Sequence, residues 1–233
     1  MTLHNQRVVV LGGTSGIGLA TAQQAATQGA TVVVASSNPE SVEKALAALP
    51  ASATGAAVDL TDAAAVRTFF AGLDSLDHLV YTAGEALTLL EIGAMDLVQA
   101  RQAFELRYFG ALGAVSAAVP RLRAGGSVVL TTGAASDRPA PGWSVAASVC
   151  GATDSLVRAL AVELAPLRVN AVKPGVVRTP LWRGGIDYDA TAAHLPVGRV
   201  GEPEDIAAAY VYLMNQPYAT GSIVTVDGGY VLV

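Results

Sequence analysis

Short runs of β-branched and other apolar residues alternate along the chain with alanine-rich segments that have the period of a helix. Seven such runs predict strands at residues 7–11, 31–35, 56–58, 78–81, 127–131, 168–172 and 222–226. The segments between them, 17–28, 39–49, 62–72, 95–120, 144–164 and 203–214, have the lengths of crossover helices. We therefore expect an α/β fold, a Rossmann-like doubly wound parallel sheet of about seven strands with helices on both faces.

Three dipeptides mark where predicted helices begin: Asn38-Pro39, Thr61-Asp62 and Glu202-Pro203. No internal repeat, linker or low-complexity tract interrupts the alternation. Residues 1–233 are accordingly predicted to form a single domain, a usual size for this class.

The composition of the chain limits the partners and ligands that we expect it to bind. Apolar residues make up 52% of the chain and charged residues 14%, so the apolar surplus predicts a homodimer or homotetramer. A net charge of -5 without a Lys/Arg cluster argues against nucleic acid and anionic membranes, which leaves a small-molecule substrate. One cysteine, a short polar start, and no long apolar run free of charges and turn signals predict a cytoplasmic protein. No cluster has metal-ligand spacing.

A glycine-rich turn follows the first predicted strand, with glycines at Gly12, Gly16 and Gly18 directly before a predicted helix. The pyrophosphate of a dinucleotide must approach backbone N–H groups at a helix N-terminus, and a Cβ would block that approach. A glycine-rich turn can also simply end a strand, so the turn alone leaves both interpretations open.

The spacing of these glycines resembles the T-G-x-x-x-G-x-G turn of the short-chain dehydrogenase/reductase family, with Leu11 in place of its threonine. Similar segments follow in the family's order: Asp59-Leu60, Tyr81-Thr82-Ala83-Gly84, Asn170-Ala-Val-Lys-Pro174-Gly175 with Val176-Val177-Arg178-Thr179, and Thr225-Val-Asp227-Gly228-Gly229. The fourth-strand segment keeps the family's Ala-Gly but has lost its two asparagines. The resemblance spans nearly the whole chain.

This resemblance implies a nicotinamide dinucleotide site formed by Gly12, Thr14, Ser15, Gly16, Ile17, Gly18, Ser36, Ser37, Asp59, Leu60, Ala83, Gly84, Pro174, Gly175, Val177 and Thr179. NAD-specific members place an acid at the end of the second strand, where this chain has Ser36 and then Ser37. A serine pair can hydrogen-bond a phosphate and does not repel it, so NADP(H) is mildly favoured over NAD(H). Ser36 and Ser37 fit equally well as part of an ordinary loop that leads into a helix, with no role in cofactor binding.

The family's proton-transfer residues are absent from the positions that the resemblance assigns to them. The tyrosine and lysine positions hold Ala146 and Cys150, the serine position holds Gly133, and the asparagine position holds Arg107. No Tyr-x-x-x-Lys arrangement occurs elsewhere, since the only lysines are Lys44 and Lys173. Proton transfer needs a positioned acid of tuned pKa, so the catalytic residues stay unknown.

Arg107, Thr132 and Ser144 are weak catalytic candidates. Arg107 could stabilise a developing oxyanion, or it could have only a structural role in its helix. The hydroxyls of Thr132 and Ser144 could donate hydrogen bonds to a substrate carbonyl, or they could serve only as structural caps. Cys150 is either a small buried apolar residue or, less often, a reactive thiol. Segment 178–198, which contains Trp182 and His194, resembles the family's substrate lid.

Three functions are consistent with these features. The first is an atypical NAD(P)-dependent short-chain oxidoreductase that transfers hydride to a small carbonyl, quinone, enone or imine. The second is a non-catalytic NAD(P)-binding redox sensor or scaffold subunit. The third is a non-redox lyase, isomerase or cyclase on the same fold. Composition does not distinguish them, because a fold does not determine a function.

Overall fold

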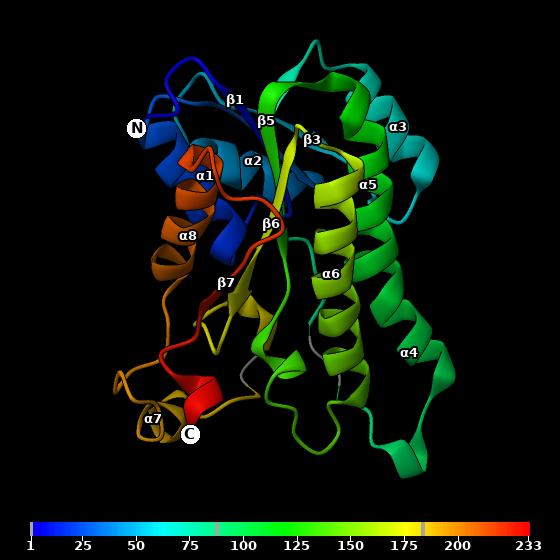
Figure 1. Cartoon of the computed structure of the whole chain (residues 1–233), viewed down its shortest axis with the longest axis vertical. Coiled ribbons are helices and arrows are strands. Elements are labelled where there is room, and N and C mark those ends of the chain that lie inside the picture. The colour runs from blue at the N-terminus through cyan, green and yellow to red at the C-terminus, as the bar shows by residue number, and fades with distance from the viewer. Residues whose placement is uncertain (1, 87–88, 183–184) are drawn as a thin grey trace.

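A computed structural model describes residues 2–86, 89–182 and 185–233 and contains a seven-stranded sheet (Figure 1). The strand order is β3-β2-β1-β4-β5-β6-β7, and every neighbouring pair is parallel. The strands are β1 (Arg7–Leu11), β2 (Thr31–Ser36), β3 (Thr54–Ala57), β4 (Leu76–Tyr81), β5 (Leu122–Thr131), β6 (Arg168–Pro174) and β7 (Ile223–Val226). The predicted doubly wound parallel fold is confirmed.

Helices cover both faces of the sheet, as the two sides of Figure 1 show. One layer contains α1 (Gly16–Thr27), α2 (Pro39–Ala47) and α8 (Pro203–Asn215). The other contains α3 (Ala63–Ala71), α5 (Ala111–Ala118) and α6 (Ser144–Glu163), with α4 (Leu97–Phe104) leading into α5. A short α7 (Tyr188–Ala192) and the 3-10 turns η1 (Ile92–Ala94), η3 (Val119–Arg121), η4 (Ala134–Ser136), η5 (Pro180–Trp182) and η6 (Tyr230–Leu232) lie in the connections.

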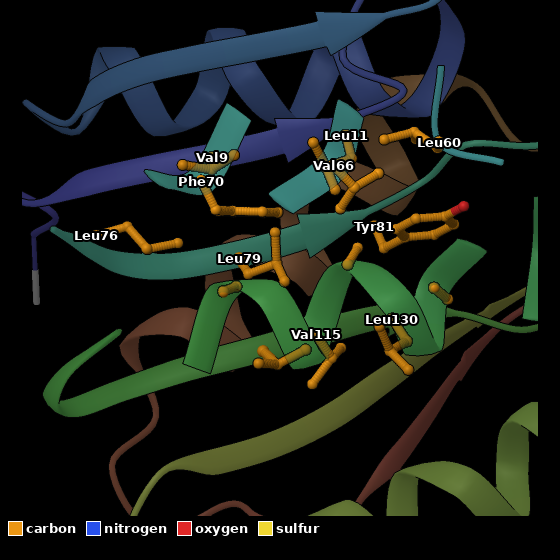
Figure 2. Close-up of a cluster of buried hydrophobic side chains, with 14 of the residues drawn as sticks. Val9, Leu11, Leu60, Val66, Phe70, Leu76, Leu79, Tyr81, Val115 and Leu130 are labelled. Atoms are coloured by element: carbon orange, nitrogen blue, oxygen red, sulfur yellow. The ribbon is translucent and has the colours of Figure 1, made fainter. Parts of the chain in front are cut away.

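The strands are apolar on both faces because both faces are covered. In β1, Val9 and Leu11 pack with Phe70, Leu79 and the other residues of the cluster under α3 and α5 (Figure 2). The alternate residues of β1 point into the second cluster, beneath α1 and α8. This double burial explains why the strands appear in the sequence as continuous apolar runs.

The expected helix starts are confirmed. The Asn38 side chain accepts hydrogen bonds from the first turn of α2, and Asp62 does the same for α3. Glu202 and Asp205 form a reciprocal capping box at α8.

The predicted helix 95–120 is wrong as a single helix. Six residues between α4 and α5 form a π-helical turn, η2 (Glu105–Gly110). The buried Tyr81 hydroxyl donates a 2.5 Å hydrogen bond to the Leu106 carbonyl, and a Cβ on Gly110 would lie only 2.6 Å from that hydroxyl oxygen. A side chain that takes a helix carbonyl in this way interrupts the regular ladder.

Several strand boundaries also differ from the prediction. β3 begins at Thr54 rather than residue 56, and its extra residues, Thr54 and Gly55, carry no hydrophobic signal although they pair with β2. β5 begins at Leu122, five residues early, because Leu122 pairs with Leu76 ahead of a register shift. β7 starts one residue later, at Ile223.

By length and composition alone, α6 could cross a membrane. Its buried residues, including Val157 and Leu160, instead pack into the core cluster on one face of the sheet. A core helix of a globular domain passes the same compositional test, so α6 carries no argument for a membrane span.

His78 is a buried titratable group in the middle of the sheet. Its ring nitrogens lie 2.8 Å from the Ser127 hydroxyl and 2.9 Å from the Gln6 side-chain oxygen, and only 2% of the residue is exposed. Burial, with a smaller contribution from the nearby Arg168 charge, lowers the pKa of His78 to about 4. The folded protein therefore holds this imidazole neutral.

This lowered pKa predicts a loss of stability in mild acid. Below about pH 6.5 the unfolded chain protonates His78 and the folded chain does not, so the free energy of unfolding falls with pH until about pH 4. The loss should total roughly 3 kcal/mol, at about 1.4 kcal/mol for each unit of pKa difference. Urea unfolding of a His78→Gln variant should show a flatter pH dependence over this window. The exposed His194→Gln control should follow the parent, and an equally flat control curve would contradict the assignment.

Candidate functional site

A cleft of about 510 Å³ runs across the carboxyl ends of the strands. Residues that follow β1, β2, β3, β4, β5 and β6 all line it. The strand order reverses between β1 and β4, and open parallel sheets bind ligands at such a point. The fold thus brings distant segments of the chain to one cavity.

The glycine-rich turn forms one end of this cleft. Gly12 has φ +80, and a Cβ there would lie 2.5 Å from the Ala83 backbone nitrogen. Gly16 has φ +48, and its Cβ would lie 3.2 Å from a methyl carbon of Thr179. The glycines therefore allow the β1 turn to approach the ends of β4 and β6 closely.

The N-terminus of α1 faces this turn without a capping side chain. Ser15 occupies the N-cap position and makes no capping side-chain hydrogen bond among the described residues, whereas Asn or Asp side chains cap α2, α3, α4 and α7. The first N–H groups of a helix need partners, and an anion can supply them. The arrangement fits a pyrophosphate, so the residues present suit a dinucleotide.

All of the residues predicted to bind the cofactor line the cleft: Gly12, Thr14, Ser15, Gly16, Ile17, Gly18, Ser36, Ser37, Asp59, Leu60, Ala83, Gly84, Pro174, Gly175, Val177 and Thr179. The sequence prediction missed Val58, Thr61 and Thr82, which line it as well. Ser36 ends β2 and Ser37 follows it, and both line the cleft. The Asp59 carboxylate accepts hydrogen bonds from the Thr61 N–H and hydroxyl, and these lower the pKa of Asp59.

The positions that the resemblance assigns to serine, tyrosine and lysine meet in the same cleft. Gly133, Ala146 and Cys150 all line it. A Cβ on Gly133 would lie 3.1 Å from the Cys150 sulfur, a tight approach. The missing side chain at Gly133 therefore makes room for the thiol of Cys150.

The hydroxyls near these positions are already engaged. The Thr132 hydroxyl donates to the Cys150 carbonyl at 3.0 Å, and the Thr131 hydroxyl is 2.6 Å from the Tyr81 carbonyl. Ser144 is the first residue of α6 and lines neither this cleft nor the smaller cavity beside it. Burial, the largest influence, raises the pKa of the Cys150 thiol, so the thiol stays protonated and is a weak acid.

Arg107 is the cation of this part of the cleft. It lies in the π-helical turn, and its Nη2 donates to the Glu85 carbonyl while its Nε is 3.6 Å from the Glu85 carboxylate. A Cβ on Gly84 would lie 2.8 Å from Nη1, so the guanidinium packs directly on the Gly84 backbone. Nη1 donates to no acceptor among the described residues. The sequence prediction missed Glu85, which no motif marks.

Lys173 lies outside the cleft lining, and its buried ammonium is bound by two carboxylates. Its ammonium is 2.7 Å from the Asp137 carboxylate and 2.8 Å from the Asp154 carboxylate. The Ser136 hydroxyl donates to Asp154 at 3.2 Å. This cluster fastens η4, next to Gly133, to α6 and β6. The sequence separates its members too widely for any local pattern to reveal them.

Segment 178–198 lies partly outside the described residues, since 183–184 are not described. Within it, Trp182 lines the cleft and its indole N–H donates to the Val177 carbonyl at 3.1 Å. His194 is exposed and does not line the cleft. Tyr230, near the C-terminus, lines the cleft under the Arg138 guanidinium, 4.5 Å from the ring centre.

The glycine turn generates a direct binding prediction. Gly16→Val places a branched side chain at positive φ beside Thr179, and should raise the Kd for NADPH and NADH more than about tenfold, which corresponds to about 1.4 kcal/mol. Gly113→Ala is the matched control, because its Cβ meets nothing within 4 Å. Calorimetric titration measures both. Parental affinity in Gly16→Val would contradict the assignment of this turn.

Comparisons with known proteins agree with the geometry. A family model described as Enoyl-(Acyl carrier protein) reductase matches residues 12–231. The chain is 33% identical to short-chain dehydrogenase/reductase malC of Malbranchea aurantiaca over 99% of this chain and 96% of that one. A structure of MalC reductase/Diels-Alderase from Malbranchea aurantiaca superposes with a TM-score of 0.92 at 31% identity, covering 99% and 98% of the two chains. A small-chain dehydrogenase in complex with NADPH superposes with a TM-score of 0.87 at 34% identity, covering 98% and 100%. The chain belongs to the short-chain dehydrogenase/reductase family, whose members include NAD(P)-dependent reductases.

Proposed function

We propose that this protein is an NADP(H)-dependent reductase that transfers hydride to a conjugated acceptor, an enone or a quinone, whose developing oxyanion Arg107 stabilises. One observation carries the proposal: the cleft presents a fixed guanidinium next to Gly84, while Ala146, Cys150 and Gly133 occupy the positions where the family has its tyrosine, lysine and serine. The bound nicotinamide would supply the hydride.

A simple ketone suits this cleft poorly. Adding hydride to an isolated carbonyl forms an alkoxide, a strong base that must take a proton as it forms. Ala146 cannot donate one, and the raised pKa of the Cys150 thiol makes that group a poor donor. The Thr132 hydroxyl is already committed to the Cys150 carbonyl.

With a conjugated acceptor, no proton has to be donated at the moment of hydride transfer. On an enone, hydride forms a C–H bond at the β-carbon, and the electron pair of the broken C=C bond moves to the carbonyl oxygen to give an enolate. On a quinone, hydride forms an O–H bond at one carbonyl oxygen, and the displaced π electrons move through the ring to the other oxygen. The quinone product is a phenolate, which is a weak base because phenols have a pKa of about 10. That anion can persist until water protonates it, so the protein need not supply an acid in the same step.

The charge of Arg107 favours an oxyanion over a cationic acceptor. A guanidinium stays protonated at all ordinary pH values and offers planar N–H donors to oxygen. Its Nη2 and Nε contact Glu85, whereas Nη1 lies against the Gly84 backbone and donates to no acceptor among the described residues. An iminium substrate would bring a second positive charge to the same place, so we favour enones and quinones over imines.

NADP(H) is the cofactor that we favour. Ser36 and Ser37 line the cleft at the end of β2, where a carboxylate would repel a 2′-phosphate. The NADPH in the structural neighbour supports a dinucleotide at this site and gives weaker support to the choice of NADPH over NADH.

A non-redox reaction is the second candidate. The structural neighbour MalC is named as both a reductase and a Diels-Alderase, which supports a cyclase on this scaffold. A cleft that orients a substrate and excludes water would suffice for such a reaction. Tight cofactor binding without turnover of any acceptor would instead favour the redox-sensor alternative.

The role of Arg107 predicts a specific kinetic change. Arg107→Gln removes the charge but keeps a polar side chain, and should lower kcat for 2,3-dimethyl-1,4-naphthoquinone and 2-cyclohexenone by about 10²-fold or more. NADPH absorbance follows the reaction. The Kd for NADPH should not change, and Arg101→Gln, an exposed arginine on α4, should behave as the parent.

Cyclohexanone is the discriminating substrate in the same assay. The parent should reduce it at least about 10²-fold more slowly than a working ketoreductase of the family. Ala146→Tyr with Cys150→Lys should raise that rate only in part, because Gly133 and Arg107 still differ from the family pattern. Rapid parental reduction of cyclohexanone that survives Arg107→Gln would overturn the proposal.

We also propose that the protein is a cytoplasmic homodimer or homotetramer. The surface of α4, the π turn and α5 exposes Leu97, Val98, Phe109 and Leu112. A partner subunit that covers these exposed side chains would explain why the chain has more apolar residues than one soluble domain needs. Light scattering at micromolar concentration should give a dimer or tetramer mass, and Leu97→Glu should shift it downward. A parental monomer at that concentration would contradict the proposal.

A further inference from the structure

A second cavity of about 160 Å³ adjoins the cleft on the side of α4 and α6. Arg107, Ala146 and Cys150 are among the residues that line both cavities, so they lie on the boundary between them. We call the second cavity the side chamber. It extends to Gln99, Gln102 and Ala103 on α4 and to Val145, Val149 and Thr153 on α6.

The small residues at this boundary keep the chamber open. Ala146 and Cys150 lie one helical turn apart on α6 and both face the chamber. A longer side chain at either position would extend into the space that they leave. The absence of large side chains here therefore creates volume beside the reacting position, in addition to removing two chemical groups.

Apolar residues form much of the chamber wall, and its two glutamines on α4, Gln99 and Gln102, are exposed to solvent. Leu90, Ala103, Val145 and Val149 contribute carbon surfaces. The Thr153 hydroxyl donates to the Val149 carbonyl at 2.9 Å, as the Thr132 hydroxyl does to Cys150. Among the described residues that line the chamber, the charged ones are Arg107 and Glu85, and these two are paired with each other. Such walls favour an uncharged, apolar occupant.

We propose that the side chamber is a substrate subsite that binds an apolar ring fused to the reacting ring of the acceptor. The proposal rests on the proposed function, and it assigns the substrate class: a polycyclic enone or quinone. Its reacting carbonyl lies against Arg107 in the cleft, and its second ring passes the boundary at Ala146 and Cys150.

The volume of the chamber suits one ring. An engineered apolar cavity of about 150 Å³ in another protein binds benzene. At about 160 Å³ the side chamber matches that size. A ring there would also fix the direction of approach to Arg107, because the chamber and the cleft meet at that residue.

Two variants fill the chamber from opposite sides without altering the cleft. Ala103→Phe enters from α4 and Val145→Phe from α6, and neither residue lines the cleft. Ser148→Phe is the control, because Ser148 is exposed on α6 and lines neither cavity. Thermal unfolding and NADPH affinity establish that each variant is folded, and the second filling variant tests the proposal if the first does not fold.

Binding without turnover provides the first test. Calorimetry compares 2-naphthol with phenol in the presence of NADP⁺. The parent and Ser148→Phe should bind 2-naphthol at least about tenfold more tightly than phenol, and each filling variant should lose that preference. An unchanged preference in a folded filling variant overturns the subsite, whether or not the protein has reductase activity.

Turnover provides the second test. The substrates are 2,3-dimethyl-1,4-naphthoquinone and tetramethyl-1,4-benzoquinone, whose methyl groups block addition of thiols. The filling variants should lower kcat/KM at least about tenfold for the two-ring quinone and leave the one-ring quinone within about twofold. Equal losses for both quinones overturn the subsite. No turnover of either quinone by the parent contradicts the proposed function, while the calorimetric preference still decides the subsite.

Discussion

The hydrogen bond from the Tyr81 hydroxyl to the Leu106 carbonyl controls the geometry of the candidate site. It takes a carbonyl from the helix ladder, and Gly110 leaves the space in which the hydroxyl lies. The result is the π-helical turn that carries Arg107 to the backbone of Gly84. In an uninterrupted helix the following residues would rotate to other faces, so the position of Arg107 depends on this one contact. Burial, the largest cause, raises the pKa of Tyr81, which keeps the hydroxyl a donor at ordinary pH.

The unusual residues of the cleft fit one another sterically. Cys150 occupies space that a side chain on Gly133 would need, and Ala146 lies one turn before it on α6. The buried Lys173 cluster fixes η4 against α6 and β6, so the wall at Gly133 has its own support. The cleft is thus a packed arrangement suited to a different acceptor chemistry, in which Arg107 is the cation among the described lining residues and the side chamber adds volume.

The fold could be predicted from sequence because its signals are local. Buried parallel strands give continuous apolar runs, and Asn38 and Asp62 mark helix starts by their own side chains. The ends of β3 and β5 were missed, since their polar and glycine residues are strand only through pairing. The broken helix after residue 95 was missed because its cause, Tyr81, lies on a different strand.

In the candidate site, too, features with a local sequence signal could be predicted, and features that depend on contacts between distant segments could not. The residues predicted to bind the cofactor follow a motif of fixed spacing, and the structure brings all of them to one cleft. The partners of Arg107, the Lys173 cluster and the side chamber arise from contacts between distant segments, and a single sequence does not contain that information. Glu85 follows a recognised Ala-Gly pair, yet only the structure brings it to Arg107.

The pH dependence of hydride transfer tests the central claim most directly, because the claim is that no side chain of the cleft donates a proton during that step. Single-turnover oxidation of bound NADPH by 2,3-dimethyl-1,4-naphthoquinone can be followed between about pH 6 and pH 9. Burial is the largest influence on the Cys150 thiol and raises its pKa above the ordinary value. The account predicts a rate that is flat with pH. A rate that falls as an acid deprotonates within that window, and loses this fall when a cleft residue is substituted, would contradict it.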